Sequence, residues 1–195
     1  MFENIPYFEE EFLNNHFAVE IESSSTCMGF DIENPAGIDP EDEYVASFWG
    51  QIVLHDCDED KEDIQKVGHM SFDVHLLRDF TNDCGVPAGC VIDDVDAEQG
   101  LCVDVIENKL KYSFDDYGVT AYVDRIDLQS NFQDKGIERY IVNHMDRIVW
   151  FAIRRKLDLL FGMATMEERT WALPASDAGS ATDGGDFVWI KHFSK

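Results

Sequence analysis

Residues 119–164, VTAYVDRIDLQSNFQDKGIERYIVNHMDRIVWFAIRRKLDLLFGMA, decide the fold that this sequence predicts. Residues 119–128 are rich in β-branched and aromatic side chains and predict a strand. A polar stretch then leads to Gly136, and residues 136–155 predict one long helix. Residues 157–164 form a continuous apolar run, which is typical of a buried strand. The helix carries one apolar stripe at helical spacing, made of Ile137, Ile141, His144, Ile148 and Phe151.

Gly136 lies where the predicted helix begins, and a glycine at this position indicates anion binding. Glycine lets another group approach the backbone closely, and the first amides of a helix have no partner within the helix. Such amides attract phosphate groups. The strand, the loop and the helix start therefore predict a turn that holds phosphate.

The same stretch resembles the core acyl-CoA-binding motif of the GCN5-related N-acetyltransferase (GNAT) superfamily. The family pattern is Gln or Arg, two residues, Gly, one residue, then Gly or Ala. Gln133 and Gly136 match this pattern, as do the strand before them and the helix and strand that follow. Glu138 departs from it, because a small residue normally lets the helix approach the pyrophosphate here.

The resemblance implies that acetyl-CoA is the co-substrate. The strand over 122–128 would splay from the next strand, and the backbone of Ile126 and Leu128 would pair with the pantetheine arm. The pyrophosphate would lie against the loop and the helix start, at Gln133, Asp134, Lys135, Gly136, Ile137 and Glu138.

The resemblance also implies that an amine attacks the thioester directly, with an acidic general base on the same strand. Asp124 and Asp127 are the candidates. Strand alternation sends their side chains to opposite faces, so we expect at most one of them to reach the acceptor. The family often has a Tyr as general acid after the fifth strand, but this sequence has no Tyr after Tyr140. Either another group protonates the leaving thiolate, or transfer has been lost.

The remaining sequence completes a GNAT-like α/β fold, with a mixed, mostly antiparallel sheet flanked by helices. We expect one domain over 1–195, in which 1–117 is an acidic part with the early strands and 118–195 is the acyl-CoA-binding core. The early strands include an antiparallel hairpin that turns at an acidic stretch, 56–63. The other expected elements are a helix or arm over 2–13, strands at 17–21, 44–55, 68–77 and 187–193, helices at 91–98 and 100–110, and loops at 23–42 and 175–186.

The charge of the chain excludes one class of partner and favours another. The sequence has 40 acids and 15 bases, a net charge of −25, and residues 1–63 alone hold 18 acids and one base. Such a surface repels phosphate backbones, so direct binding of nucleic acid is not expected. A cationic acceptor suits it, such as a polyamine, an aminoglycoside-like amine or a basic peptide, and so does a basic protein partner.

The cysteines and the apolar runs predict a soluble cytoplasmic protein without a metal site. The five cysteines form no regular framework, which favours reduced thiols, and no run is long enough to span a membrane. The acidic stretch after His55 lacks the Gly and Glu of a calcium loop, and the cysteines contain no CxxC pair for zinc. On the helix stripe, His144 is expected to be a core histidine.

Three functional hypotheses follow from the sequence. The first is an acyl-CoA-dependent N-acyltransferase, most simply an acetyltransferase, that acts on a small amine or a basic peptide. The second is a catalytically inactive protein derived from this fold, whose acidic face mimics DNA or inhibits a basic nucleic-acid-binding partner. Glu138 and the missing Tyr favour it. The third is an acidic domain whose charge only gives solubility. The sequence does not indicate the oligomeric state.

Overall fold

A seven-stranded sheet forms the centre of the computed structural model, which describes residues 2–25, 44–56, 63–93, 95–164, 180–181 and 187–193. The strand order is β1-β2-β3-β4-β5-β7-β6, and only the β4–β5 pair is parallel. This arrangement confirms the predicted α/β class, with a mixed and mostly antiparallel sheet. The strands are β1 (Phe17–Ser25), β2 (Val45–Asp56), β3 (Asp63–His75), β4 (Thr120–Leu128), β5 (Leu159–Ala164), β6 (Ser180–Ala181) and β7 (Phe187–His192).

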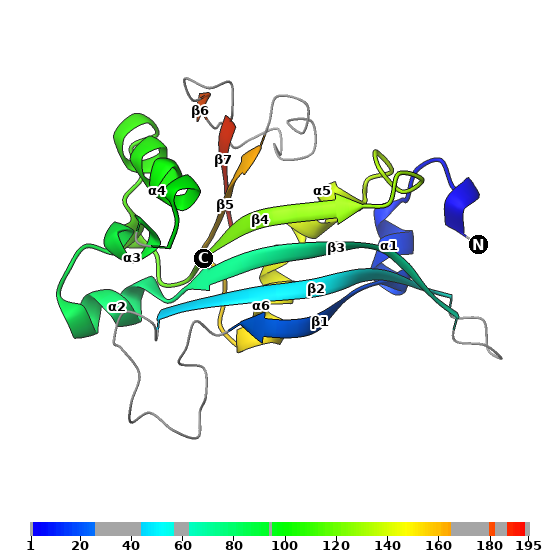
Figure 1. Cartoon of the computed structure of the whole chain (residues 1–195), viewed down its shortest axis with the longest axis horizontal. Coiled ribbons are helices and arrows are strands. Elements are labelled where there is room, and N and C mark those ends of the chain that lie inside the picture. The colour runs from blue at the N-terminus through cyan, green and yellow to red at the C-terminus, as the bar shows by residue number, and fades with distance from the viewer. Residues whose placement is uncertain are drawn as a thin grey trace.

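The sheet divides where β4 meets β5. Strands β1 to β4 run alongside one another, whereas β5 and β7 cross their direction steeply (Figure 1). Only four residue pairs join β4 to β5, from Thr120–Leu159 to Val123–Gly162, although β4 continues to Leu128. The resemblance predicted a splay over 122–128, and the two strands diverge from Asp124 onward, because Tyr122 and Val123 still pair with β5.

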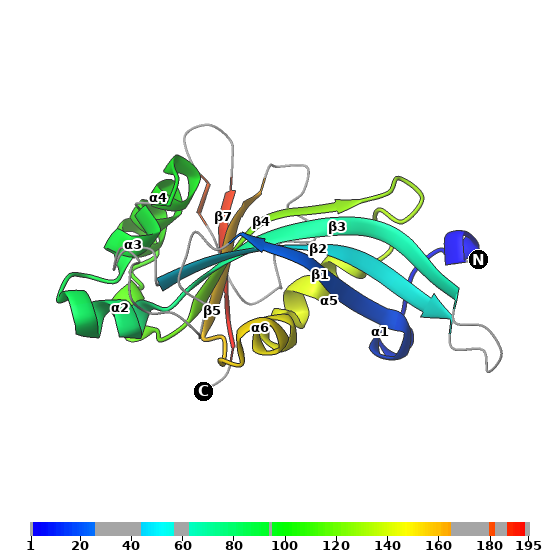
Figure 2. The same cartoon turned by 60° about the horizontal axis from the view of Figure 1, so that its bottom comes forward.

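The helices flank this sheet in two groups. Helices α1, α5 and α6 lie against one face, and α2, α3 and α4 gather at the end of the sheet near β5 (Figure 2). The helices are α1 (Glu10–His16), α2 (Leu77–Cys84), α3 (Gly89–Asp93), α4 (Ala97–Asp104), α5 (Ile137–Asn143) and α6 (Met145–Ile153), with short turns η1 (Phe2–Asn4), η3 (Val105–Lys109) and η4 (Phe114–Asp116).

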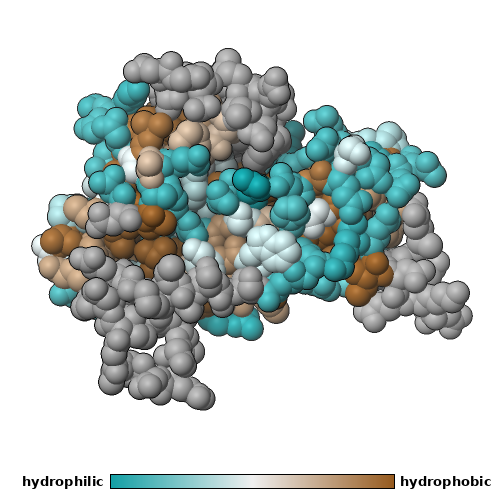
Figure 3. Space-filling model, viewed as in Figure 1, coloured by the Kyte–Doolittle hydropathy of each residue, from teal (hydrophilic) through white to brown (hydrophobic). Residues whose placement is uncertain are grey.

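Apolar and polar side chains alternate along β3. Met70, Phe72 and Val74 are buried on the side of α5 and α6, while Ser71 and Asp73 alternate with them. Figure 3 views the face opposite α5 and α6, and hydrophilic residues dominate it over β3 and β4. The polar face of the sheet is therefore available for binding.

The prediction of one helix over 136–155 was wrong. Helix α5 ends at Asn143 and α6 begins at Met145, because His144 leaves helical geometry with φ −115° and ψ 18°. The break turns α6, so that Met145 and Val149 are its buried residues and the predicted stripe residue Phe151 is 67% exposed.

For residues 2–13 the sequence predicted a helix or an arm, and the structure has η1 and a non-helical stretch over 2–9 and then helix α1 from Glu10. The boundaries of the other helical predictions were wrong. The predicted helices at 91–98 and 100–110 are replaced by α3, α4 and η3, because Asp96 caps α4 by accepting hydrogen bonds from the amides of Glu98 and Gln99.

Several predictions concern residues outside the described part of the chain, namely most of the loop at 23–42, most of the acidic turn at 56–63, and most of the loop at 175–186. Within the described residues, no helix has the length and apolar character needed to cross a membrane.

Candidate functional site

The end of β4 offers the backbone that the resemblance assigns to the donor. In the described part of the chain, residues 125–128 of β4 pair with β3 on one side, and residues 124–128 pair with nothing on the β5 side. Ile126 and Leu128 lie in this stretch. Their free edge can accept an extended ligand, as an added strand would.

The loop that follows β4, residues 129–136, is held in a tight turn. Asp134 and Gly136 both have positive φ, 58° and 92°. The Gln133 side-chain amide donates to the Leu128 carbonyl at 3.1 Å, and the Lys135 ammonium donates to the Glu3 carbonyl at 2.6 Å. Gln133 therefore ties the loop to the end of β4, and Lys135 ties it to the N-terminal segment at Glu3.

The Glu138 carboxylate lies against backbone amides at and just before the start of α5. Its side chain is buried, and its carboxylate accepts hydrogen bonds from its own backbone amide and from that of Asp134. Burial raises the pKa of Glu138, and these two hydrogen bonds act in the opposite direction. Two of the six residues that the resemblance assigns to pyrophosphate, Asp134 and Glu138, thus direct their amides at a carboxylate of the same chain.

An N-terminal strap, residues 2–9, lies over the same loop. The Phe8 amide donates to the Lys135 carbonyl at 2.9 Å, and the Phe8 ring stacks on Phe132. A β-carbon at Gly136 would lie 2.8 Å from two atoms of the Tyr7 ring. Gly136 is therefore favoured by its positive φ whether or not a phosphate binds, and a β-carbon there would displace the Tyr7 ring.

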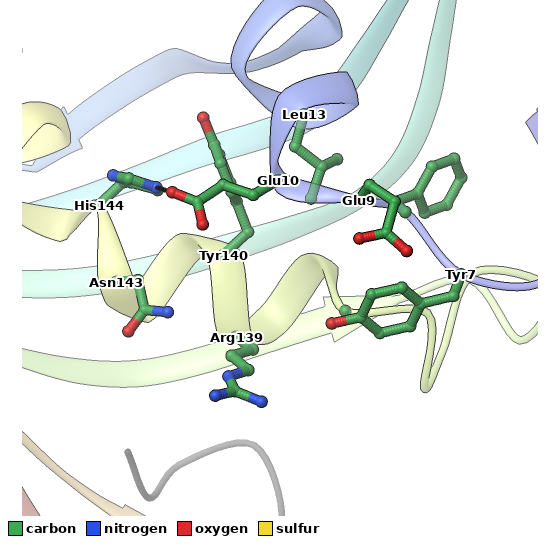
Figure 4. A pocket seen from close by; sticks show the side chains of 10 residues that line it. Tyr7, Glu9, Glu10, Leu13, Arg139, Tyr140, Asn143 and His144 are labelled. Atoms are coloured by element: carbon green, nitrogen blue, oxygen red, sulfur yellow. Dashed lines mark ion pairs between the residues drawn. The ribbon is translucent and has the colours of Figure 1, made fainter. Parts of the chain in front are cut away.

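The strap and α5 enclose a cavity of about 290 Å³ (Figure 4). Glu10 reaches the Nε2 atom of His144 across it at 3.4 Å, and the Tyr140 hydroxyl donates to Asn14. Burial and Arg147 lower the pKa of His144. The prediction that His144 is a core residue was wrong, because its ring lines this cavity instead.

A second cavity, of about 400 Å³, lies on the polar face of the sheet and is called the acidic pocket below. Strands β2, β3 and β4 and the segment before α4 all contribute to it. Its lining residues are Ser47, Phe48, Trp49, Ser71, Asp73, Val95, Asp96 and Asp124.

A buried glutamine joins two of the carboxylates of the acidic pocket. The Gln99 side-chain nitrogen donates to Asp73 at 2.6 Å and to Asp96 at 3.0 Å. Its oxygen lies 2.9 Å from Nε2 of His75. Burial lowers the pKa of His75 to about 4, so the ring is neutral at pH 7 and carries a single N–H. Its Nε2–H donates a hydrogen bond to the Gln99 side-chain oxygen. This orients the Gln99 amide with its nitrogen toward the carboxylates.

The carboxylates of the acidic pocket repel one another. Burial raises the pKa of Asp73, and the charges of Asp124 and Asp96 raise it further, while hydrogen bonds from Ser47 and Gln99 oppose the shift. A cation bound among these groups would relieve the repulsion.

The prediction that Asp124 and Asp127 point to opposite faces was wrong. The register between β3 and β4 shifts between Ser71 and Phe72, so that Asp124 has no partner in the ladder. Asp124 accepts a hydrogen bond from Ser71 at 2.5 Å, and Asp127 lies 3.2 Å from His69 on the same face. The bulge cancels one step of the alternation.

The two aspartates nevertheless have different surroundings. Asp124 lines the acidic pocket, whereas Asp127 is half exposed and pairs with His69 and, at 3.7 Å, with Arg125. Asp127 is therefore an ion-paired surface residue, and Asp124 is the candidate that faces a cavity.

The lining of the acidic pocket suits an organic cation. No group of three or more His, Cys, Asp or Glu side chains among the described residues is arranged to hold a metal. Trp49, which is 37% exposed, adds an aromatic wall beside the carboxylates. Carboxylates beside an aromatic ring bind ammonium groups.

The sequence did not identify Trp49, Asp73, Asp96 or Gln99 as site residues. The alternation of β3 did place Asp73 on the polar face, which was a usable signal. The contribution of Asp96 and Gln99 depends on how the helical segment between β3 and β4 folds back onto the sheet, and no local pattern reveals that.

Comparison with known proteins gives distant structural neighbours only. No family model and no curated protein matches this chain. One solved structure, described as the crystal structure of a KacTA–DNA complex, has a TM-score of 0.42 and 11% identity, over 90% of this chain and 92% of its own.

Two structures of Arabidopsis thaliana NAA60 are also similar. The one with acetyl-CoA has a TM-score of 0.35 and 10% identity, over 98% of this chain and 88% of its own. The one with a bisubstrate analogue has a TM-score of 0.35 and 8% identity, over 76% of this chain and 75% of its own. At these TM-scores the likeness assigns neither a function nor a residue to this chain.

Proposed function

We propose that this protein is an acyl-CoA-dependent N-acyltransferase, most simply an acetyltransferase, that acts on a cationic amine. One observation carries the proposal. Asp124 lines the acidic pocket, and it is also the first residue of β4 beyond the last pair with β5. A pocket suited to an ammonium group thus adjoins the stretch of β4 that the GNAT resemblance assigns to the donor.

The acidic pocket supplies the binding energy for the acceptor. Asp73, Asp96 and Asp124 attract an ammonium group, and the indole of Trp49 adds a cation–π contact worth about 0.5–2 kcal/mol. Polyamines, aminoglycoside-like amines and basic peptides all present such a group. The net charge of −25 concentrates these cations near the surface.

An acyl-CoA donor would fit the edge of β4 better than it fits the loop at 129–136. The free edge of β4 suits a pantetheine arm, whereas the loop at 129–136 suits a pyrophosphate only after the Tyr7 ring and the Glu138 carboxylate move away. Tyr7 is 47% exposed, which leaves its ring room to rotate. An acyl-CoA would bring the electrophilic thioester carbon.

Carboxylates of the acidic pocket would act as the general base that accepts a proton from the acceptor amine. The bound ammonium group first loses one proton to the pair Asp73 and Asp124, because only the neutral amine can attack. As its nitrogen bonds to the acyl carbon and the carbon–sulfur bond breaks, the nitrogen loses a second proton to water. Burial raises the pKa of Asp73, which makes it a stronger base than an exposed aspartate. The thiolate leaves and takes a proton from water.

The test is acceptor-dependent release of free thiol from acetyl-CoA. Spermidine, an aminoglycoside and a lysine-rich peptide serve as acceptors. We expect Asp124→Asn to reduce turnover about 100-fold. Asp127→Asn is the matched control on the same strand, and its turnover should equal that of the wild type. Equal turnover of both variants would contradict a catalytic role for Asp124. If no acceptor causes thiol release, the protein is not an acyltransferase for these amines.

A second candidate is a protein that binds a cationic partner without transferring an acyl group. The position of Glu138 favours it, because a buried carboxylate on the pyrophosphate amides blocks the donor as long as it stays there. This candidate predicts saturable binding of an amine or a basic protein to the acidic pocket. It also predicts no heat of binding for acetyl-CoA in calorimetry.

A further inference from the structure

Three buried polar side chains form a hydrogen-bonded network that ends on carboxylates of the acidic pocket. Thr120, His75 and Gln99 are each 0% exposed. The Thr120 hydroxyl lies 3.4 Å from Nδ1 of His75, and Nε2 of His75 lies 2.9 Å from the Gln99 side-chain oxygen. Tyrosine and tryptophan aside, the described residues include four buried polar or charged side chains, and three of them belong to this network. Burying polar groups is costly unless they are hydrogen-bonded, so their concentration beside the pocket calls for an explanation.

The order of donors and acceptors in this network gives Gln99 a single orientation. The Thr120 hydroxyl donates to Nδ1 of His75, so the one proton of the neutral ring lies on Nε2 and is donated to the Gln99 oxygen. The Gln99 nitrogen then faces Asp73 at 2.6 Å and Asp96 at 3.0 Å, with one N–H for each. A reversed amide would set its oxygen against both carboxylates, which is repulsive.

Gln99 connects two parts of the pocket that are otherwise held separately. The second oxygen of Asp96 accepts hydrogen bonds from the amides of Glu98 and Gln99, at 2.8 Å each, at the start of α4. Asp73 lies on β3 opposite Ser47 of β2 and accepts a hydrogen bond from it. The Gln99 amide thus joins a carboxylate of the sheet to the carboxylate that caps α4.

The charged groups that act on Asp73 are acidic. The titratable groups around Asp73 and Gln99 are His75 on β3, Tyr122 and Asp124 on β4, and Asp96, Glu98 and Cys102 at the start of α4 or within it. Burial lowers the pKa of His75 to about 4 and raises the pKa of Tyr122 and of Cys102, so these three are neutral at pH 7. The charges of Asp124 and Asp96 both raise the pKa of Asp73, whereas the hydrogen bond from Gln99 lowers it. Gln99 therefore favours the anion at Asp73 without cancelling its charge, as a lysine or an arginine would.

We propose that Gln99 is the positioning residue of the acidic pocket, which holds Asp73 and Asp96 together as anions that face the ammonium group of the acceptor. The inference rests on the proposed function only in that the acidic pocket is the site for the amine. Gln99 acts through the two carboxylates, and His75 acts through Gln99. Since the hydrogen bond from Gln99 favours ionised Asp73, it also extends amine binding to lower pH.

The test is calorimetric titration of spermidine into the full-length protein between pH 5 and pH 8. Gln99→Met keeps the length of the side chain and removes the donor. We expect its affinity for spermidine to fall about tenfold at the acidic end of this range, because Asp73 then takes up a proton at higher pH. The midpoint of the pH dependence should rise by about one pH unit, which corresponds to a tenfold change in proton affinity.

Gln65→Met is the matched control for this substitution. It makes the same change on β3 and removes a hydrogen bond to the Phe2 amide, outside the acidic pocket. We expect its affinity for spermidine and its pH midpoint to equal those of the wild type.

A second pair of variants changes the residue that orients Gln99. His75→Leu removes the donor to the Gln99 oxygen, so the amide is free to reverse. His75→Gln keeps an N–H that reaches this oxygen. We expect His75→Leu to weaken spermidine binding at least about threefold, and His75→Gln to restore the wild-type affinity. Circular dichroism and the melting temperature establish that each variant is folded.

Each outcome decides the proposal. A weaker affinity and a raised pH midpoint in Gln99→Met, together with the rescue by His75→Gln, support it. A folded Gln99→Met that binds spermidine as the wild type does at every pH overturns it, even where stability is lost, and leaves the acidic pocket as the amine site. If Gln99→Met does not fold, equal affinities of His75→Leu and His75→Gln overturn the proposal. A wild type that does not bind spermidine overturns the pocket itself, and with it the acceptor site of the proposed function.

Discussion

The Tyr7 ring lies so close to Gly136 that a β-carbon at position 136 would be 2.8 Å from its Cε2 and Cζ atoms. Gly136 also has a φ of 92°, which only glycine adopts without strain. The glycine that indicated a phosphate-binding turn in the sequence is thus explained by its positive φ, and the present position of the Tyr7 ring also depends on it. A bulky substitution there would unfold or displace the strap as well as block a donor.

This contact leads to a prediction about stability. Gly136→Ala should destabilise the protein by about 1–2 kcal/mol through its positive φ, and by a further amount through the clash with Tyr7. Combining it with Tyr7→Ala should recover about 1 kcal/mol, because the clash is removed and the backbone strain stays. Urea unfolding of the four proteins of this double-mutant cycle measures the coupling. Additive effects would mean that the ring and the glycine do not touch.

A second prediction concerns the loop at 129–136, to which the resemblance assigns the pyrophosphate of CoA. Glu138→Ala removes the carboxylate that now accepts hydrogen bonds from the amides of Asp134 and Glu138, so these donors become free for a pyrophosphate. We expect CoA to bind at least about tenfold more tightly, which corresponds to about 1.4 kcal/mol. Glu138→Gln is the control, since its side chain still fills the site. Calorimetric titration of CoA gives the affinities, and equal affinity of the wild type and Glu138→Ala contradicts this role.

The sequence predicted the strands better than the helices, for a physical reason. Strand β4 and its apolar neighbour β5 have local patterns strong enough to identify them, β2 is rich in aromatic and β-branched residues, and β3 alternates clearly. The break at His144 has no local signal, because the sequence has neither Gly nor Pro there. It accompanies a tertiary contact, in which His144 reaches Glu10 of α1.

The sequence could predict only those residues of the candidate site that a local sequence pattern identifies. Asp124 was found because it lies on the strand of the recognised motif. Its face could not be predicted, since a β-bulge depends on pairing with β3. Gln99 could not be found at all, because it reaches Asp73 across 26 residues of sequence.

A third prediction follows from the buried charge of Asp73. Burial raises the pKa of Asp73, so the folded state holds its proton more readily than the unfolded state does. The ionised residue therefore lowers stability at pH 7, and this penalty disappears as the pH falls through the raised pKa. Asp73→Asn should raise the melting temperature at pH 7 by about 2–4 °C, which corresponds to about 1 kcal/mol. The gain should vanish in acid, and a gain equal at both pH values would contradict the explanation.

A fourth prediction follows from His75, which is buried and has a pKa lowered to about 4. Below pH 6.5 the unfolded chain takes up a proton on this histidine, while the folded protein resists it until about pH 4. Stability is thus full above pH 6.5 and falls as the pH drops toward 4, by up to about 3 kcal/mol. His75→Gln should remove this part of the pH dependence. Urea unfolding between pH 7 and pH 4 compares the two slopes, and parallel slopes would contradict it.

The most direct measurement of the proposed activity is thiol release from acetyl-CoA in the presence and absence of spermidine. We expect release that requires the amine, that is lost in Asp124→Asn and that persists in Asp127→Asn. The folded wild type and Glu138→Ala should both be assayed, because the variant removes the carboxylate from the donor loop. Absence of amine-dependent release from both proteins, with spermidine, an aminoglycoside and a lysine-rich peptide alike, would contradict an acyltransferase.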